Sequence, residues 1–282
     1  MEEAIILNGR KLADRIENEL SKRVEELYIA TNKRPKLVTI LVGDFAPSVT
    51  YVNMKKRACE RVGLDCDIIT FNENTTTDKL LEKINELNND DSVDGIIIQH
   101  PVPSHINEQH CFNTVAVNKD VDGVSFYSFG KMCNKEKAFV SATSLGIIKL
   151  LKEYDIKIAG KHAVVVGRSA ILGKPIAMQL LNANATITIA HSKTENLKEI
   201  LQQADIVVGA LGRPKYLQAE WFKKGVVLID AGYNAGNVGD IDLENASEIA
   251  SAYTPVPGGV GPMTIVSLLI QTVESFEEKI TK

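Results

Sequence analysis

The sequence predicts an α/β protein of two parallel-sheet domains, the second a Rossmann-type dinucleotide-binding domain, with a cleft between the two. Three observations lead to this prediction. The chain has 282 residues, more than one typical core organises. Short apolar runs alternate with amphipathic stretches in both halves, which is typical of parallel strands joined by helices. The stretch at 118–140 reads as irregular, so we place the domain boundary near residue 140.

The first half opens with an amphipathic helix predicted over 8–30, with Asn8 as its N-cap. The run at 37–42 is continuously apolar, as in a strand covered on both faces. The elements around and after it alternate regularly: further strands are predicted at 67–71 and 95–99, and helices at about 48–62 and 77–87. This order predicts a parallel sheet.

A helix at about 143–154 leads into the second half. Its predicted strands lie at 163–166, 186–189, 206–209 and 226–229, and helices begin near 173, 195 and 218. Right-handed crossovers make a doubly wound topology the expected one. The last helix, from residue 264 onward, is expected to pack back on the first domain because no sheet of its own remains for it to cover. The predicted domains are therefore 1–140 joined by 264–282, and 141–263.

Composition restricts the function. Hydrophobic residues make up 44% and charged residues 24% of the chain, which is ordinary for a soluble globular protein. The net charge of −4 argues against a nucleic-acid partner. No apolar run has the length of a membrane span, and the acidic N-terminus lacks the features of a signal peptide. The four cysteines form no CxxC pair and the histidines no ligand pattern, so we expect a cytoplasmic protein with reduced thiols and no metal.

The loop at 254–264 is unusual in composition, because it holds three prolines and three glycines. Proline fixes φ, and glycine permits positive φ and close backbone approach. Such a mixture is typical of backbone held in one shape against a ligand. A plain turn before the last helix is the alternative, although a turn needs fewer special residues. The loop has no group that moves a proton at neutral pH.

A phosphate-binding loop is predicted between the strand at 163–166 and the following helix. It contains Gly167, Arg168, Ser169 and Gly173 in the pattern G-x-S-x-x-x-G. A dinucleotide fold places its pyrophosphate at this position, on a helix N-terminus. The spacing differs from G-x-G-x-x-G, so an ordinary strand–helix turn stays an alternative.

The sequence favours NADP over NAD as the cofactor. The guanidinium of Arg168 can hold a phosphate through two hydrogen bonds. The next strand ends at 191–194, where an NAD-binding protein would carry an acidic residue for the ribose. This sequence has two hydroxyls, a lysine and a histidine there, which suit a 2′-phosphate. Ser192 could bind that phosphate or cap a helix, or serve in both ways.

Four polar residues of the first domain form a candidate reactive site. Tyr51 and Lys55 are four residues apart and share a helix face. A lysine in a partly buried site can have a lowered pKa and transfer protons. Gln99 ends a predicted strand, and Asp122 lies in an acidic turn. Each has a structural alternative: Tyr–Lys pairs are common on surface helices, glutamine can cap a strand, and aspartate favours turns.

These segments together resemble a known family. In order they are Tyr51-x-x-x-Lys55, Gln99-x-Pro101-x-Pro103, Asp120-Val121-Asp122-Gly123, Val166-Gly167-Arg168-Ser169 with Gly173 and Pro175, and Pro257 to Thr264. The combination, which spans essentially the whole chain, is similar to the bifunctional methylenetetrahydrofolate dehydrogenase/methenyltetrahydrofolate cyclohydrolases. Three differences stand out. His100 occupies a position where an apolar residue is common, Ser141–Ser144 replace a proline-containing linker, and the loop at 43–48 differs in its middle.

The resemblance implies a homodimeric, NADP-dependent enzyme of one-carbon metabolism, which serves purine and amino-acid biosynthesis. Its folate substrate would lie in the cleft between the domains. The resemblance also implies roles for the residues: Lys55 as the key catalytic residue with Tyr51 and Gln99 tuning it, Asp122 on the pterin, Gly258 and Gly259 beside the folate, and Gly167, Arg168, Ser169, Gly173 and Ser192 on NADP.

Three alternatives stay open. A short-chain dehydrogenase also uses Tyr-x-x-x-Lys, but in that class the glycine loop precedes the pair within one domain. A monofunctional dehydrogenase would release the methenyl product. A non-enzymatic NADP-sensing module would account for Arg168 but would leave the first-domain residues unexplained.

Overall fold

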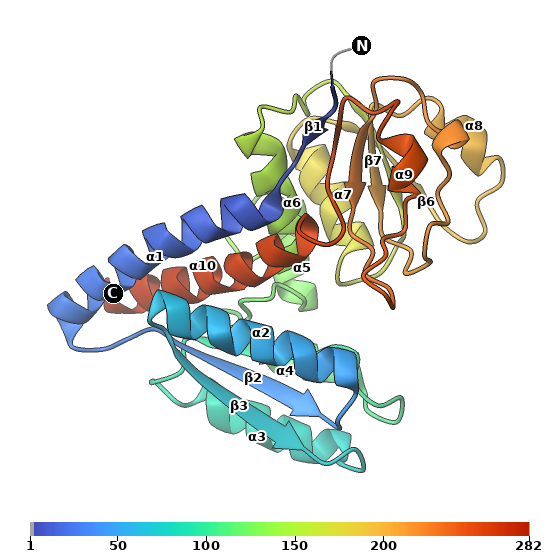
Figure 1. Ribbon diagram of the computed structural model, residues 1–282. Coiled ribbons are helices and arrows are strands. Elements are labelled where there is room, and N and C mark those ends of the chain that lie inside the picture. Colours follow the sequence, from blue (N-terminus) through green and yellow to red (C-terminus); the bar gives the residue numbers. More distant parts are fainter. Residues whose placement is uncertain (1–2, 282) are drawn as a thin grey trace. The chain divides into compact units, whose positions relative to one another are not determined.

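The computed structural model describes residues 3–281, which divide into two compact units (Figure 1). The six-stranded unit contains the N-terminal residues through Ala13 together with Thr143–Thr264. The three-stranded unit contains Asp14–Ala142 and the C-terminal residues from Ile265 onward. Both sheets are parallel throughout, which confirms the predicted fold class.

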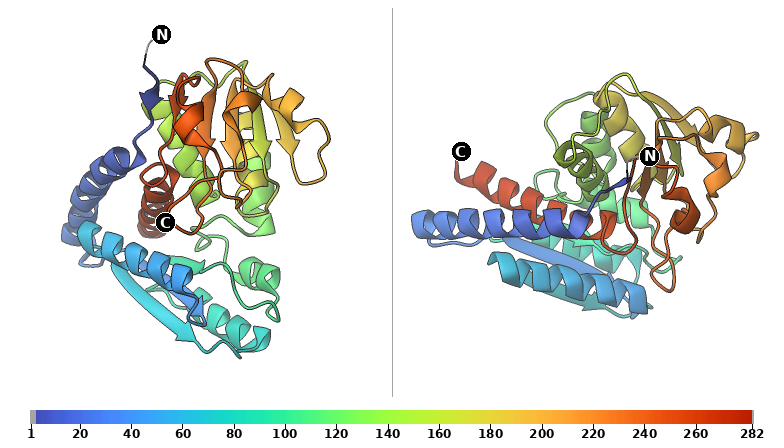
Figure 2. Two further views of the ribbon diagram at one scale, coloured as in Figure 1. Left: turned by 45° about the vertical axis from the view of Figure 1, so that its right-hand side comes forward. Right: turned by 45° about the horizontal axis from the view of Figure 1, so that its top comes forward.

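The three-stranded unit is built around β2 (Lys36–Val42), which pairs with β3 (Asp65–Phe71) on one side and β4 (Gly95–Ile98) on the other. Six of the seven residues of β2 are buried, as its continuous apolar run predicts. Helix α2 (Ala46–Val62) lies along β2 and β3 (Figures 1 and 2). The remaining helices of this unit are α1 (Gly9–Thr31, which begins in the other unit), α3 (Thr77–Asn88), α4 (Glu108–Thr114), α5 (Phe126–Cys133) and the greater part of α10 (Val260–Ile280).

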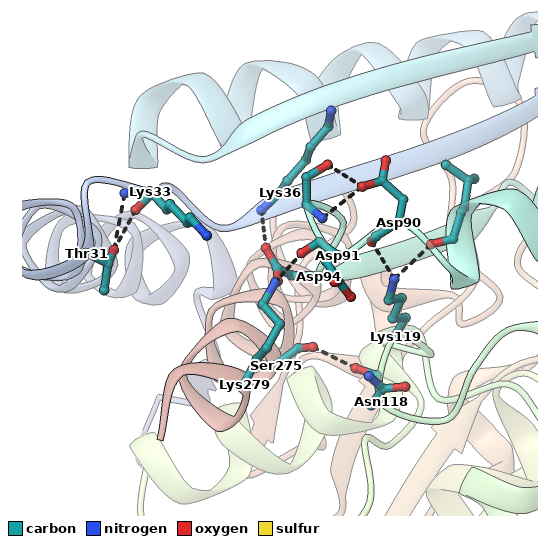
Figure 3. A network of polar contacts seen from close by, with 12 residues as sticks. Thr31, Lys33, Lys36, Asp90, Asp91, Asp94, Asn118, Lys119, Ser275 and Lys279 are labelled. Atoms are coloured by element: carbon teal, nitrogen blue, oxygen red, sulfur yellow. Dashed lines mark hydrogen bonds and ion pairs between the residues drawn. The ribbon is translucent and has the colours of Figure 1, made fainter. Parts of the chain in front are cut away.

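Helix α10 is fastened to the rest of the three-stranded unit by polar contacts near its C-terminal end. Near its C-terminal end, Lys279 forms an ion pair with the buried carboxylate of Asp94, which also accepts a hydrogen bond from the backbone N–H of Lys36 at 2.8 Å (Figure 3). One turn earlier, the Ser275 hydroxyl donates to the Asn118 carbonyl at 2.6 Å. These contacts hold the helix against the edge of β4.

The six-stranded unit has the strand order β1-β9-β8-β7-β5-β6. Its strands are β1 (Ile5–Ile6), β5 (His162–Val166), β6 (Thr186–Ala190), β7 (Ile206–Gly209), β8 (Val227–Asp230) and β9 (Ala252–Tyr253). Its helices are α6 (Ala142–Glu153), α7 (Gly173–Asn182), α8 (Leu197–Leu201) and α9 (Leu243–Ala246), with a 3₁₀ turn at Ala219–Trp221. From β5 the chain passes to β6 on one side, and it then crosses over to β7 on the other side of β5. The carboxyl ends of β5 and β7 therefore form a topological switch point, where ligands bind in such sheets.

The structure differs from the sequence-based expectation at several places. The helix expected near 218 is only a 3₁₀ turn, and β9 and α9 were not predicted. The N-terminal strand β1 extends the six-stranded sheet by pairing with β9, although residues 1–140 were assigned to the other domain. Two-residue strands carry no periodicity that a sequence reveals. The irregular assignment of 118–140 was wrong for α5, and α4 was not predicted. Both helices are short and begin at side-chain caps, Asn107 and Ser125.

Two buried aspartates tie the loops at the carboxyl edge of the six-stranded sheet together. Asp230, at the end of β8, accepts hydrogen bonds from three backbone N–H groups, those of Gly232, Asp240 and Ile241, each at 2.9 Å. Asp240 in turn accepts from the three consecutive N–H groups of Leu211–Arg213 at 2.6 to 2.9 Å. The loop after β7 is therefore fixed by a carboxylate that the loop after β8 supplies.

Asp230 gives the stability of this unit a defined pH dependence. Burial raises its pKa to about 6, above the ~3.9 of an unfolded aspartate. The fold therefore favours the protonated form, and this contribution is complete below pH ~4 and is lost as pH rises through about 6. We predict that the free energy of unfolding of the wild type, measured by denaturant titration, falls relative to that of Asp230→Asn between pH 4 and 7, by up to about 1.4 kcal/mol per unit of pKa shift. Exposed Asp155→Asn is the control; a constant difference for Asp230→Asn contradicts the prediction.

Gly9 makes the closest backbone approach in the six-stranded unit. A Cβ atom on Gly9 would lie 1.9 Å from the carbonyl oxygen of Gly259. We predict that Gly9→Ala destabilises the protein by about 1–3 kcal/mol, because the 258–259 loop must move. Gly130, inside α5, has no atom within 4 Å of such a Cβ, and Gly130→Ala should be neutral or stabilising by up to about 1 kcal/mol. Thermal melting tests both, and an unchanged Gly9→Ala melting temperature would refute the steric argument.

Candidate functional site

The structure brings Lys55 and Gln99 together at the carboxyl end of the three-stranded sheet. Lys55 lies on the inward face of α2 and is 7% exposed, and its ammonium donates to Gln99 Oε1 at 2.9 Å. Gln99 follows β4 directly and is fixed at both ends. Its backbone N–H donates to the Ile40 carbonyl of β2 at 2.8 Å, and its side-chain Nε2 donates to the His100 carbonyl at 2.7 Å. The acceptor of the Lys55 ammonium is therefore held in a fixed orientation.

Asp122 is the charged residue with the largest electrostatic effect on Lys55. Burial lowers the pKa of Lys55, and the Asp122 carboxylate partly opposes this effect. Burial likewise raises the pKa of Asp122, while Lys55 and His100 pull it down. The neutral amine of Lys55 is thus easier to reach than that of a solvated lysine, which suits a group that exchanges protons.

The turn that carries Asp122 is fixed by its neighbours. Asp120 is buried and accepts from the Ser125 N–H at 3.1 Å and the Ser128 hydroxyl at 2.6 Å, so it organises the start of α5. Gly123 has a φ of +61°, and a Cβ there would lie 2.2 Å from the backbone of Val140. Of the two acidic residues in the turn, Asp120 is structural and Asp122 is the one coupled to Lys55.

The remaining predicted member of this group, Tyr51, lies one turn before Lys55 on α2 and is half-buried. An additional ionisable pair lies beside these residues. His100 follows Gln99, and its Nδ1 lies 2.7 Å from Glu108 Oε1 at the start of α4. The sequence marks His100 as unusual but does not reveal its partner, because α4 is too short for its periodicity to show. The cap residue Asn107 was the available signal.

The predicted phosphate loop lies at the switch point of the six-stranded sheet. Gly167 has a φ of +140°, and a Cβ there would lie 2.1 Å from the Ala210 carbonyl oxygen after β7. A Cβ on Gly173 would lie 2.4 Å from the Gly167 carbonyl oxygen. Ser169 closes the loop by accepting the Gly173 N–H at 3.1 Å. Both glycines are thus required by backbone contacts.

Arg168 and Ser192 lie at the same edge of this sheet. Val166 of β5 and Ala190 of β6 are paired in register. Arg168 lies two positions after Val166, and Ser192 lies two positions after Ala190. Both side chains are exposed. Ser192 caps no helix, because α8 begins at Leu197 with Asn196 before it. The turn at 191–194 is closed by Thr194, whose hydroxyl accepts the His191 N–H at 2.8 Å.

The 254–259 loop also belongs to the six-stranded unit. Buried Thr254 accepts the Asp230 N–H at 2.8 Å, and Gly258 has a φ of +102°. The Gly258 carbonyl accepts the Arg10 N–H at 2.8 Å. Gly259 is buried, and a Cβ there would lie 2.5 Å from the Pro255 carbonyl oxygen. Backbone packing therefore accounts for Gly259, whereas Gly258 keeps its peptide partly exposed.

The six-stranded unit fits a dinucleotide. The loop after β5 leads directly into the N-terminus of a ten-residue helix, which is where a dinucleotide fold places a pyrophosphate. The next strand ends in a turn with no carboxylate and with Lys193 exposed. Sequence reasoning missed Asp230 and Asp240, which fix the loops at this edge; the buried strand ending in Asp-x-Gly was the signal. Within residues 3–281, no three side chains are grouped to hold a metal ion, and no helix is long and apolar enough to cross a membrane.

Two family models match the chain. The catalytic domain of tetrahydrofolate dehydrogenase/cyclohydrolase matches residues 7–122, and the NAD(P)-binding domain of the same family matches residues 141–280. A Cellvibrio japonicus relative named bifunctional protein FolD is 55% identical over 277 residues, which covers 98% of this chain and 99% of the relative. An Acinetobacter baumannii protein of the same name is 56% identical over 278 residues, with 98% and 99% coverage.

Solved structures agree. A Campylobacter jejuni bifunctional FolD methylenetetrahydrofolate dehydrogenase/cyclohydrolase superposes with a TM-score of 0.95 at 40% identity, covering 98% of this chain and 99% of that one. A Trypanosoma brucei methylenetetrahydrofolate dehydrogenase-cyclohydrolase, complexed with NADP cofactor and inhibitor, gives a TM-score of 0.96 at 32% identity with full coverage of both chains. The resemblance drawn from the motifs is confirmed: with both domains matched in order and near full length, this chain belongs to the tetrahydrofolate dehydrogenase/cyclohydrolase family.

Proposed function

We propose that the protein oxidises 5,10-methylenetetrahydrofolate to 5,10-methenyltetrahydrofolate with NADP and then hydrolyses the product to 10-formyltetrahydrofolate. Family membership gives the reaction pair. The observation that carries the assignment of residues is the buried contact between the Lys55 ammonium and Gln99 Oε1, with Asp122 coupled to it. A buried ammonium is costly to maintain, so its presence at the carboxyl end of a parallel sheet points to chemistry.

Asp122 is the residue we assign to the pterin. Asp122 is a half-buried residue and burial raises its pKa, so its carboxylate could accept a hydrogen bond from a ring N–H, and its protonated form could donate one to a ring nitrogen. Tyr51, on the same helix face as Lys55, would contact the substrate beside it. Gly258 and Gly259 would present bare backbone to the folate.

The six-stranded unit would hold NADP. Gly167, Ser169 and Gly173 would accommodate the pyrophosphate, and Arg168 with Ser192 would bind the 2′-phosphate. Bound NADP supplies the acceptor for the hydride that leaves the methylene bridge. The absence of an acidic residue at 191–194 favours NADP over NAD, and the Trypanosoma brucei relative was solved with NADP.

Lys55 would act in the hydrolytic step. Water adds to the bridging carbon of the methenyl cation, one water proton is lost, and a carbon–nitrogen bond of the ring opens to leave the 10-formyl group. Lys55 in its amine form would take the proton from the attacking water. Gln99 would hold the amine in place without competing for the proton, because a neutral amide is not basic at neutral pH.

A monofunctional dehydrogenase is the second candidate, and a non-enzymatic NADP-binding module the third. The Lys55–Gln99–Asp122 group favours both activities over dehydrogenation alone, and it has no use in a module that only binds NADP. The homodimer, the cytoplasmic setting and the lack of a nucleic-acid partner stay predictions.

The direct experiment supplies methylenetetrahydrofolate with NADP or NAD and follows reduced nicotinamide and methenyl product separately. We expect NADP-dependent reduction without lasting accumulation of the methenyl compound. Without NADP-dependent turnover the dehydrogenase proposal fails. Methenyl product that decays no faster than in buffer removes the cyclohydrolase proposal.

We predict that Lys55→Met lowers hydrolysis of supplied methenyltetrahydrofolate by about 100-fold or more, because it removes the group that takes the proton. NADP binding, measured by calorimetry, should be unchanged. Lys56→Met is the matched control, since Lys56 is the exposed neighbour on the same helix. Normal hydrolysis by Lys55→Met would show that the assignment is wrong.

We predict that Arg168→Ala weakens NADP binding by about 10-fold or more and leaves NAD binding nearly unchanged, because only NADP carries the 2′-phosphate for a charge-assisted hydrogen bond. Dissociation constants for both nucleotides, measured on both proteins, give the comparison. Equal losses for the two nucleotides would exclude a phosphate-reading role for Arg168.

A further inference from the structure

We propose that the His100–Glu108 pair carries the proton released in methenyl hydrolysis from the Lys55 site to solvent. This inference rests on the proposed cyclohydrolase activity and adds a residue pair to it. It starts from a feature of this chain, the exposed histidine that directly follows Gln99.

The pair has the geometry of an oriented imidazole. His100 Nδ1 lies 2.7 Å from Glu108 Oε1, and the same carboxylate oxygen accepts the Val102 N–H at 3.3 Å. Glu108 is thus held from two sides and fixes the ring. Nε2 of His100 has no hydrogen-bond partner among residues 3–281, and the side chain is 46% exposed. One ring nitrogen is therefore bound to a carboxylate and the other is open to water.

In the proposed hydrolysis, Lys55 needs a nearby titratable group that can pass its proton to water. Lys55 is buried, and within the described part of the chain its ammonium has one hydrogen-bond partner, Gln99 Oε1. The Gln99 amide cannot take up a proton, and its Nε2 already donates to the His100 carbonyl. A proton captured by Lys55 therefore cannot pass on to the group that its ammonium hydrogen-bonds. His100 is the adjoining residue in the chain and the one with access to water.

Charge supports the same direction. Asp122 interacts electrostatically with both Lys55 and His100, so it links the two cations. The groups that act on His100 are Glu108, by hydrogen bond and charge, and Asp122, by charge, and the Glu108 contact raises the pKa of His100. The four side chains alternate in sign, with Lys55 and His100 positive and Asp122 and Glu108 negative. Such a series favours a proton's passage through water to the imidazole and its loss from there to solvent.

The proton balance makes the two activities respond differently. Dehydrogenation moves a hydride from the methylene carbon to NADP and releases no proton. Hydrolysis combines the methenyl cation with water and yields 10-formyltetrahydrofolate and one proton. A group that only exports this proton is needed for hydrolysis and not for dehydrogenation.

The test is His100→Leu, measured with supplied methenyltetrahydrofolate at low buffer concentration and corrected for the enzyme-free rate. We expect kcat for hydrolysis to fall by about 10-fold or more, with KM little changed. The rate should recover as imidazole buffer is added, because a small base replaces the missing side chain. The wild-type rate should be independent of buffer. Glu108→Gln should show a smaller loss with the same recovery.

His110→Leu is the matched control, because His110 is an exposed histidine of α4 whose ring has no carboxylate partner in the described residues. It should behave as wild type. The rate of methenyl formation from the methylene substrate, read as NADPH, should be the same in His100→Leu and wild type.

Undiminished hydrolysis by His100→Leu at low buffer overturns the inference, and so does a loss that buffer does not restore. An equal loss of dehydrogenation also overturns it, because the histidine would then be structural. In each of these cases the wild type still hydrolyses the methenyl substrate, so the proposed function stands. If the wild type itself fails to hydrolyse it, the proposed function fails first.

Discussion

The candidate chemistry depends on one interaction, the hydrogen bond between the buried Lys55 ammonium and Gln99 Oε1. An ammonium taken out of water without compensation costs several kcal/mol. Here the cost is limited because the acceptor comes from the end of β4, whose backbone is already fixed to β2. The Asp122 carboxylate, which lies in the turn after β4 and α4, partly offsets the lowering of the Lys55 pKa that burial causes. Burial without full charge neutralisation is what leaves the lysine able to exchange protons.

Positioning at both candidate sites follows one architectural rule. The side chains that matter follow the carboxyl ends of parallel strands: Gln99 after β4, the Gly167 loop after β5 and Ser192 after β6. Within each sheet, parallel strands bring their carboxyl ends to one edge, so residues far apart in sequence converge there without long loops. The helix N-terminus at Gly173 adds a partial positive charge at this edge of the six-stranded sheet.

Structural carboxylates support this arrangement without taking part in the chemistry. Asp120 fixes the start of α5 beside Asp122, and Asp94 joins β2 to the end of α10. Asp230 and Asp240 form a relay from the end of β8 to the loop after β7. In each case one carboxylate satisfies several donors that would otherwise be buried without partners. Acidic residues in turns thus serve either as structural acceptors or as members of the candidate site. Their contacts distinguish the two roles, whereas their spacing in the sequence does not.

The sequence by itself determined the parallel α/β class, the longer elements, the family and the candidate residues, because apolar periodicity and glycine–proline motifs are local properties. The tertiary structure decided what local patterns do not contain. It joined β1 to the sheet of the other unit, placed α4 and its Glu108 beside His100, and showed that the Gly259 carbonyl leaves no room for a side chain on Gly9. It also showed that Asp120 and Asp122 have different partners, Ser128 for the first and Lys55 for the second. Contacts between segments distant in sequence depend on packing, which no single segment encodes.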